Sequence, residues 1–246
     1  MKNILRQEIE KTIIESPGCG NVRAGGNMTN KYQTLTIHPD DRSTDDLRLV
    51  YRDIGTELIT NTITAGRLHD RVAAVERTLC LGHGVPQGLI GGGMQLCIDD
   101  SFVPLFQQQS ENIYIWCNAD CFVQRHGLSG FATGMFISEP MEARVFNVNA
   151  SQEQITFSNR LFCKLVNDAI KANMTNEETA EYVLRHYNDL ASEVIEYNRV
   201  RLGSYRDGVL THNYLSASRA TNGGRATEYS YVGACEIGEG VEARPA

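Results

Sequence analysis

The sequence predicts an α/β fold, a three-layer sandwich in which a mostly parallel central sheet lies between two layers of helices. Between residues 31 and 148, short strand-like segments alternate with helix-like segments. Strands separated by helices form right-handed crossovers, which build parallel sheets. The chain has 246 residues, of which 41% are hydrophobic and 22% charged. These are ordinary globular values, and this length is enough to bury a core without disulfides or metals.

Three regions follow one another along the chain. Residues 1–30 are expected to form an extension of one short helix and a loop, because Gly, Asn and Ser dominate its second half. Residues 31–202 are expected to form the α/β domain. Residues 203–246 are rich in Gly, Ser, Thr and Asn, which predicts a loop-rich C-terminal tail.

The elements of the domain are predicted from hydrophobic periodicity, β-branched runs and capping residues. Ser43 is the expected N-cap of the first helix, and Thr175–Glu178 forms a capping box for the last. The expected strands are 32–37, 58–63, 77–81, 112–116 and 136–138, with 142–148 extending the sheet, and the expected helices are 43–54, 67–74, 151–171 and 175–202.

Charge and cysteine content exclude several classes of protein. The net charge of −7 argues against a general nucleic-acid binder, which needs a basic face to neutralise phosphates. No run of 18 apolar residues occurs, so we expect no membrane span, and the N-terminus lacks the apolar core of a secretory signal. The seven cysteines follow no small-scaffold spacing, which predicts reduced thiols in a cytoplasmic protein. The oligomeric state is left open.

Reactive side chains follow two predicted strands at the point where each strand ends. His83 lies between Gly82 and Gly84 after one strand, and Cys117 directly ends another. Ligands of parallel sheets bind beyond the carboxyl ends of the strands. A thiol and an imidazole that meet there form the minimal cysteine-nucleophile pair, in which the imidazole accepts the thiol proton. The flanking glycines leave a backbone N–H for the oxyanion.

This order of motifs resembles the caspase-hemoglobinase fold, which includes caspases, gingipains, legumains and separases. His83 in LGHG resembles the family's histidine, and Cys117 in IYIWC resembles its nucleophile. Gly84 resembles the residue whose N–H helps to form the oxyanion hole. The resemblance implies a cysteine peptidase acting on a peptide or protein substrate, without a cofactor. Its specific part covers residues 77–122.

Several assignments at this site stay open. Cys121 also lies just past the strand and competes with Cys117 as the nucleophile or as a substrate contact. Asp40 ends the first strand at the same sheet edge, where it would orient the imidazole or contact substrate. Cys117, Cys121 and His126 have no second ligand pair at finger-like spacing, so no metal site is predicted.

Two other functions compete with the peptidase hypothesis. The first is a non-catalytic binding or scaffold module that uses the same sheet edge. The second is an α/β hydrolase or transferase acting on a nucleotide or small metabolite. A peptide-based thiol probe separates the first from the peptidase, and stabilisation by a small ligand would favour the second.

Overall fold

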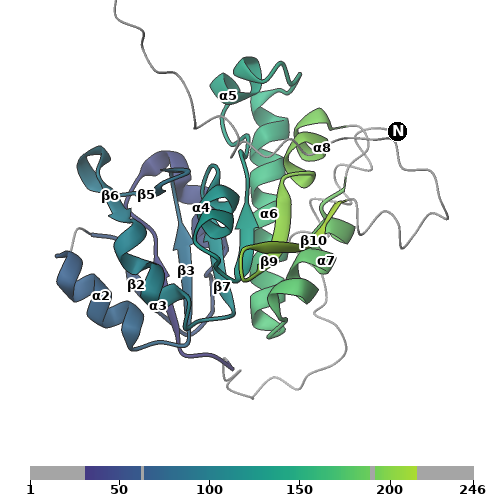
Figure 1. Cartoon of the computed structure of the whole chain (residues 1–246). Coiled ribbons are helices and arrows are strands. Elements are labelled where there is room, and N and C mark those ends of the chain that lie inside the picture. Colours follow the sequence, from purple (N-terminus) through teal and green to yellow (C-terminus); the bar gives the residue numbers. More distant parts are fainter. Residues whose placement is uncertain (1–30, 62–63, 189–191, 215–246) are drawn as a thin grey trace, which may run out of the picture.

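The computed structural model describes residues 31–61, 64–188 and 192–214, and within this part a seven-stranded sheet forms the centre of the molecule (Figure 1). The strand order is β10-β9-β8-β7-β3-β1-β2. The pairs from β2 to β8 are parallel, and β9 and β10 are antiparallel to their neighbours. The predicted α/β class with a mostly parallel sheet is therefore confirmed. The strands are β1 Thr34–Ile37, β2 Thr56–Ile59, β3 Arg77–Leu81, β7 Asn112–Ile115, β8 Gly130–Thr133, β9 Leu202–Arg206 and β10 Val209–Asn213.

Helices cover both faces of this sheet, and each face has its own hydrophobic core. On one face lie α2 (Ala65–Ala73), α3 (Val103–Phe106) and α4 (Ala119–Arg125). On the other face lie η1 (Arg42–Leu49), α6 (Gln152–Lys171), α7 (Asn176–His186) and α8 (Glu193–Arg199). A short helix, α5 (Pro140–Val145), precedes α6. We call these the α4 face and the α6 face.

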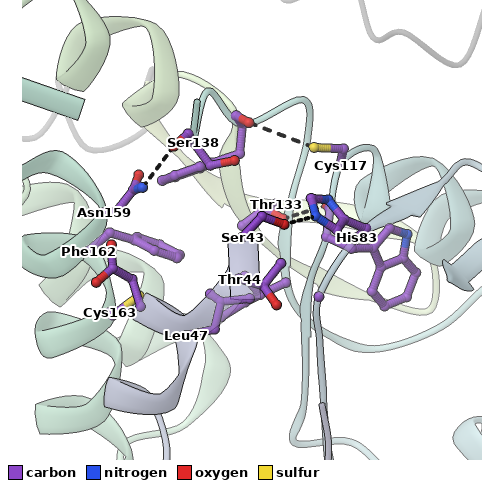
Figure 2. A pocket seen from close by; sticks show the side chains of 15 residues that line it. Ser43, Thr44, Leu47, His83, Cys117, Thr133, Ser138, Asn159, Phe162 and Cys163 are labelled. Carbon is purple, nitrogen blue, oxygen red and sulfur yellow. Dashed lines mark hydrogen bonds between the residues drawn. The ribbon is translucent and has the colours of Figure 1, made fainter. Parts of the chain in front are cut away.

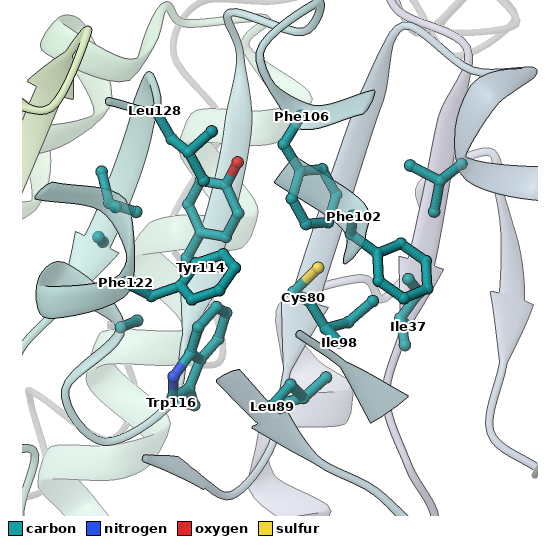
Figure 3. Close-up of a cluster of buried hydrophobic side chains, with 14 of the residues drawn as sticks. Ile37, Cys80, Leu89, Ile98, Phe102, Phe106, Tyr114, Trp116, Phe122 and Leu128 are labelled. Carbon is teal, nitrogen blue, oxygen red and sulfur yellow. The ribbon is translucent and has the colours of Figure 1, made fainter. Parts of the chain in front are cut away.

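A small second sheet stands between β3 and β7 in the chain. Its strands are β4 (Gly84–Val85), β5 (Gly88–Ile90) and β6 (Leu96–Ile98), all antiparallel. Two 3-10 turns accompany it, η2 (Gly92–Met94) and η3 (Asp100–Phe102). The glycine run 91–93 lies in the turn between β5 and β6. The small sheet thus follows directly on His83 and covers part of the α4 face (Figure 3).

The structure corrects several expected elements. Residues 203–214 are not part of a tail, because β9 and β10 form a hairpin that completes the central sheet. Asp207 and Gly208 both have positive φ at its turn, and an Asp-Gly pair between strands is a strong hairpin signal that composition alone concealed. Residues 142–145 are helical in α5, and 136–138 follow β8 as a loop. The predicted extension 1–30 and the segment 215–246 lie outside the described residues.

The remaining differences concern the helices. Asp41, not Ser43, caps the first helix, which is a 3-10 helix whose Ser43 N–H donates to the Asp41 carboxylate. Ser151 and Thr175 cap α6 and α7 with reciprocal capping boxes, as their sequences predict. The long helix expected over 175–202 is instead two helices, α7 and α8. None of the helices in the described part of the chain has the length and apolar composition that crossing a bilayer requires.

Candidate active site

A narrow pocket opens on the α6 face beyond the ends of β3 and β7 (Figure 2). It encloses about 50 Å³, which is room for only a few water molecules. Both His83 and Cys117 contribute to its wall. The other lining residues come from η1, the ends of β3 and β7, β8 and its following loop, and α6, and they are Ser43, Thr44, Asp46, Leu47, Gly82, Ile115, Trp116, Thr133, Phe136, Ser138, Asn159, Phe162 and Cys163.

The strand register brings His83 and Cys117 to the same level of the sheet. Leu81 of β3 pairs with Ile115 of β7, and the two reactive residues each lie two positions further on. Neighbouring strands lie about 4.8 Å apart, and residues two apart in a strand share a face. Leu81 and Ile115 both belong to the core of the α6 face. The sequence prediction that the two strand ends meet at one edge is therefore matched by a shared pocket.

His83 is held by a short chain of hydrogen bonds from the loop after β1. The Nε2 atom of His83 lies 2.6 Å from Ser43 Oγ, which in turn lies 2.7 Å from Asp41 Oδ1. The hydrogen bonds from Ser43 lower the pKa of Asp41, so this carboxylate is ionised at neutral pH and only accepts. The single hydroxyl proton of Ser43 goes to Asp41, and His83 Nε2–H donates to Ser43. In neutral His83 the lone pair is thus on Nδ1.

Cys117 is a neutral thiol in this arrangement. Its Sγ donates to the carbonyl oxygen of Phe136 over 3.7 Å. Burial raises its pKa to about 11, and the carboxylates of Glu142 and Glu139 act in the same direction. Among the described residues no hydrogen bond joins Cys117 to His83. The sulfur is therefore a neutral thiol, and it shares the pocket with His83 without forming an ion pair.

Gly84 has a packing role that the sequence did not reveal. A Cβ atom on Gly84 would lie 2.0 Å from Cδ1 of Trp116, whose indole N–H donates to the Val85 carbonyl. The Ile90 N–H donates to the His83 carbonyl oxygen, so His83 and Ile90 form a hydrogen-bonded pair of the antiparallel ladder. Such pairs alternate with pairs that are not hydrogen-bonded, and the next pair is Gly84 with Leu89. The backbone N–H of Gly84 therefore makes no hydrogen bond within the small sheet. Gly84 thus combines close contact with Trp116 and a backbone N–H beside His83 that makes no hydrogen bond within the small sheet.

Two of the predicted substrate contacts are not at the pocket. Cys121 is disulfide-bonded and 1% exposed within α4, so it is neither a free thiol nor a substrate contact. This also corrects the expectation that all thiols are reduced, although Cys80, Cys97, Cys117 and Cys163 are free. Asp40 lies outside the pocket lining and pairs with Arg48 over 3.1 Å. Residue 121 falls on the buried side of a helix that begins right after the strand, and this orientation excludes it.

The pocket also contains residues that sequence reasoning missed. Ser43 was expected only as a helix cap, yet it is the direct partner of His83. Asn159 and Phe162 come from α6, more than 40 residues after Cys117 in the chain, where the helical period indicated only packing. In the sequence of α6, Asn159 follows the buried Ser158 and is a polar residue within the otherwise apolar stripe of the helix. This polar residue in an apolar stripe was the sequence signal that could have identified Asn159 as part of the pocket.

Neither a search for metal-binding side chains nor a comparison with known proteins identifies a further site. In the part of the chain that the structure describes, no group of three or more His, Cys, Asp or Glu side chains is placed to hold a metal ion. No protein-family model matches the sequence, and neither a curated protein nor a solved structure matches it.

Proposed function

We propose that this protein is a cysteine peptidase of caspase-like type, in which Cys117 attacks the scissile carbonyl and His83 is the general base and acid. The observation that carries the proposal is the pair's register: both residues lie two positions beyond paired residues of adjacent parallel strands and line one pocket. The same strand-end placement of a Gly-His-Gly and a cysteine underlies the resemblance to the caspase-hemoglobinase fold. The substrate is a peptide or protein.

The hydrogen-bond chain gives each nitrogen of His83 a role. Nε2–H is bound to Ser43, so Nδ1 accepts the Cys117 proton as sulfur attacks the carbonyl carbon. Nδ1–H then passes that proton to the leaving amine as the C–N bond breaks and a thioester remains. Water, deprotonated by the same nitrogen, hydrolyses the thioester and restores the thiol. Asp41, through Ser43, stabilises the imidazolium that forms in between.

Backbone donors would stabilise the tetrahedral oxyanion. The N–H of Gly84, which makes no hydrogen bond within the small sheet, lies next to His83, and the N–H of Cys117 lies on the nucleophile itself. Two such donors at one oxygen are typical of acyl-transfer enzymes. Because Cys117 has a pKa of about 11, proton transfer to His83 accompanies attack and no preformed thiolate is required.

A peptide-based electrophile tests the proposal, and Cys97 provides the matched control. Cys97 is a free, half-buried thiol with a pKa also raised to about 11, and it lies outside the pocket lining. A peptidyl acyloxymethyl ketone should label Cys117 and leave Cys97 unmodified. His83→Ala should abolish labelling of Cys117, whereas iodoacetamide at high pH should modify both thiols. Equal peptidyl labelling of the two thiols, or labelling that survives Cys117→Ala, would contradict the proposal and favour the non-catalytic module.

One observation favours a second candidate, a serine hydrolase that uses Ser43. His83 is hydrogen-bonded to Ser43 and not to Cys117. Against it, Asp41 binds the hydroxyl of Ser43 and not the other nitrogen of His83, so the three groups do not form a relay of the serine–histidine–aspartate kind. Ser43→Ala separates the two: the cysteine mechanism loses about tenfold in rate, the equivalent of one net hydrogen bond, whereas a serine mechanism loses all activity.

A further inference from the structure

We infer that the pocket beside Cys117 selects a small, uncharged side chain with a hydrogen-bond donor on the substrate residue whose carbonyl is attacked. This inference rests on the proposed peptidase function and deepens it. The residue concerned is P1, the one on the acyl side of the cleaved bond. Serine, threonine and asparagine have this chemistry.

The size of the pocket limits the side chain that fits. Its 50 Å³ hold a few water molecules, which is about the room that three or four heavy atoms require. Ile115, Phe136 and Phe162 form rigid walls, and Ile115 and Phe162 belong to the buried core of the α6 face. Lysine and arginine side chains are longer than this space allows.

Charge on the pocket wall excludes acidic side chains. No lysine or arginine is among the lining residues that the structure describes, and Glu139 and Glu142 act electrostatically on Cys117. A carboxylate at P1 would therefore lose its hydration beside the like charges of Asp46, Glu139 and Glu142, with no lysine or arginine in the described lining to compensate.

The nearby carboxylates are also committed, which removes the counterion for a basic side chain. Asp46 pairs with Arg160 over 3.3 Å. Glu142 accepts from the backbone N–H of Ser138 and Glu139 and from the Ser138 hydroxyl, over 2.7, 3.0 and 3.1 Å. A cation at P1 would break one of these interactions before it could form its own.

One hydrogen-bond acceptor in the pocket has no partner. Asn159 donates from Nδ2 to the Ser138 carbonyl oxygen over 3.0 Å, and this contact fixes which end of the amide is oxygen. The Oδ1 atom is buried and has no partner within the described residues. Buried polar atoms are usually paired, so an unpaired acceptor at a ligand site invites a donor. The Thr44, Thr133 and Ser138 hydroxyls already take part in hydrogen bonds, whereas Asn159 Oδ1 is the buried side-chain oxygen of the lining that has no partner among the described residues.

A set of peptide substrates that differ only at P1 tests the inference on the full chain. Threonine and valine are the decisive pair, because they have the same shape and differ in the hydroxyl. We expect kcat/KM to be about tenfold higher for P1 threonine, the effect of one satisfied hydrogen bond. Aspartate, glutamate, lysine and arginine should be cleaved at least tenfold more slowly than threonine. A threonine-to-valine ratio of one or less, or a charged P1 as the best substrate, would overturn the inference while leaving the peptidase intact.

Variants locate the effect at Asn159. Asn159→Leu removes the acceptor at similar volume and should bring the threonine-to-valine ratio to about one. Asn167→Leu is the matched control on the same helix, since Asn167 binds the Val50 and Arg52 carbonyls away from the pocket. It should reduce stability and leave the ratio unchanged. An unchanged ratio in Asn159→Leu overturns the inference. Failure of the proposed function is distinct: no peptide is cleaved at all and Cys117 is not labelled by the peptidyl ketone, and the inference falls with it.

Discussion

The two faces of the central sheet are built from the same strands, yet they enclose different chemistry. On the α4 face, alternate residues of β3 and β7 place Cys80, Tyr114 and Trp116 in an aromatic cluster with Phe106 and Phe122 (Figure 3). On the α6 face, Leu81 and Ile115 lead to His83 and Cys117 and to the pocket. A thiol within a strand, Cys80, is thus fully buried, and a thiol two positions past a strand end, Cys117, lines the pocket.

The largest expected difference between the two faces is the reaction of their thiols, Cys117 and Cys80, with a small alkylating agent. The pKa of Cys117 is about 11, so its thiolate fraction rises tenfold per pH unit below that value. Between pH 7 and 10 we expect its alkylation rate in the native protein to rise about a thousandfold. Cys80 is completely buried, and burial raises its pKa well above the usual value of a thiol. It should stay unmodified, as measured by mass spectrometry of quenched samples.

The unreacted Cys80 is also the control for folding at high pH. If Cys80 is modified together with Cys117, the protein has unfolded and the comparison is repeated at lower pH. A Cys117 rate that is already maximal at pH 7 would contradict the neutral thiol and indicate a preformed thiolate.

Truncation of the aromatic cluster should have the largest effect on stability. Trp116 is 2% exposed, and its ring meets Tyr114 and Phe122 edge-on. Trp116→Ala should lower the free energy of unfolding by about 3–5 kcal/mol through lost burial and a residual cavity. Ile115→Val, on the opposite face, is the milder control at about 0.5–1.5 kcal/mol. Urea denaturation measures both, and a cost below about 1 kcal/mol for Trp116→Ala would mean that the cluster collapses around the gap.

The sequence predicts the sheet and the two strand ends because both follow from local pattern. The apolar runs of β3 and β7 are buried throughout, and the residues right after them are reactive. Parallel pairing then brings the two ends to one edge without further information. This is why His83 and Cys117, far apart in the chain, could be placed together in advance.

The rest of the site depends on contacts that local pattern does not encode. Ser43 reaches His83 across 40 residues of chain, and Asn159 reaches the pocket from α6. Trp116 directly precedes Cys117, and only the packed structure shows its role: the indole N–H donates to the Val85 carbonyl oxygen and the ring lies against Gly84. The exclusion of Cys121 likewise depends on the direction of α4, which the sequence does not fix.

Two buried titratable groups should give the two sides of the sheet opposite responses to acid. Burial lowers the pKa of His38 from 6.5 to about 4, so between these values the unfolded state binds the extra proton and acid destabilises the fold. Burial raises the pKa of Asp120 on α4 from 3.8 to about 6, so there the folded state binds the proton and acid stabilises it. Each effect amounts to about 3 kcal/mol and they nearly offset each other.

A variant that removes one of these groups should therefore reveal the pH dependence of the unfolding free energy that the other group causes. Asp120→Asn is expected to lose about 3 kcal/mol more unfolding free energy than the wild type when the pH falls from 6.5 to 4. His38→Gln should show the reverse change over the same interval. Denaturant titrations at the two pH values measure both differences. Parallel curves for all three proteins would show that neither burial acts as described.

The smallest expected effect concerns the close contact between Gly84 and Trp116, beside the pocket. Gly84→Ala would place a Cβ 2.0 Å from Trp116 and 2.7 Å from the Gly88 carbonyl oxygen, so either the indole or β4 must move. Such overpacking costs about 1–3 kcal/mol. Gly66→Ala, with open space around it in α2, is the control and should be stabilising by about 0.5–1 kcal/mol. In a Trp116→Leu background the cost of Gly84→Ala should fall, because much of the obstruction is gone. Additive losses in the double variant would instead locate the strain at Gly88, and the two faces would then be coupled through the backbone of the small sheet and not through the indole.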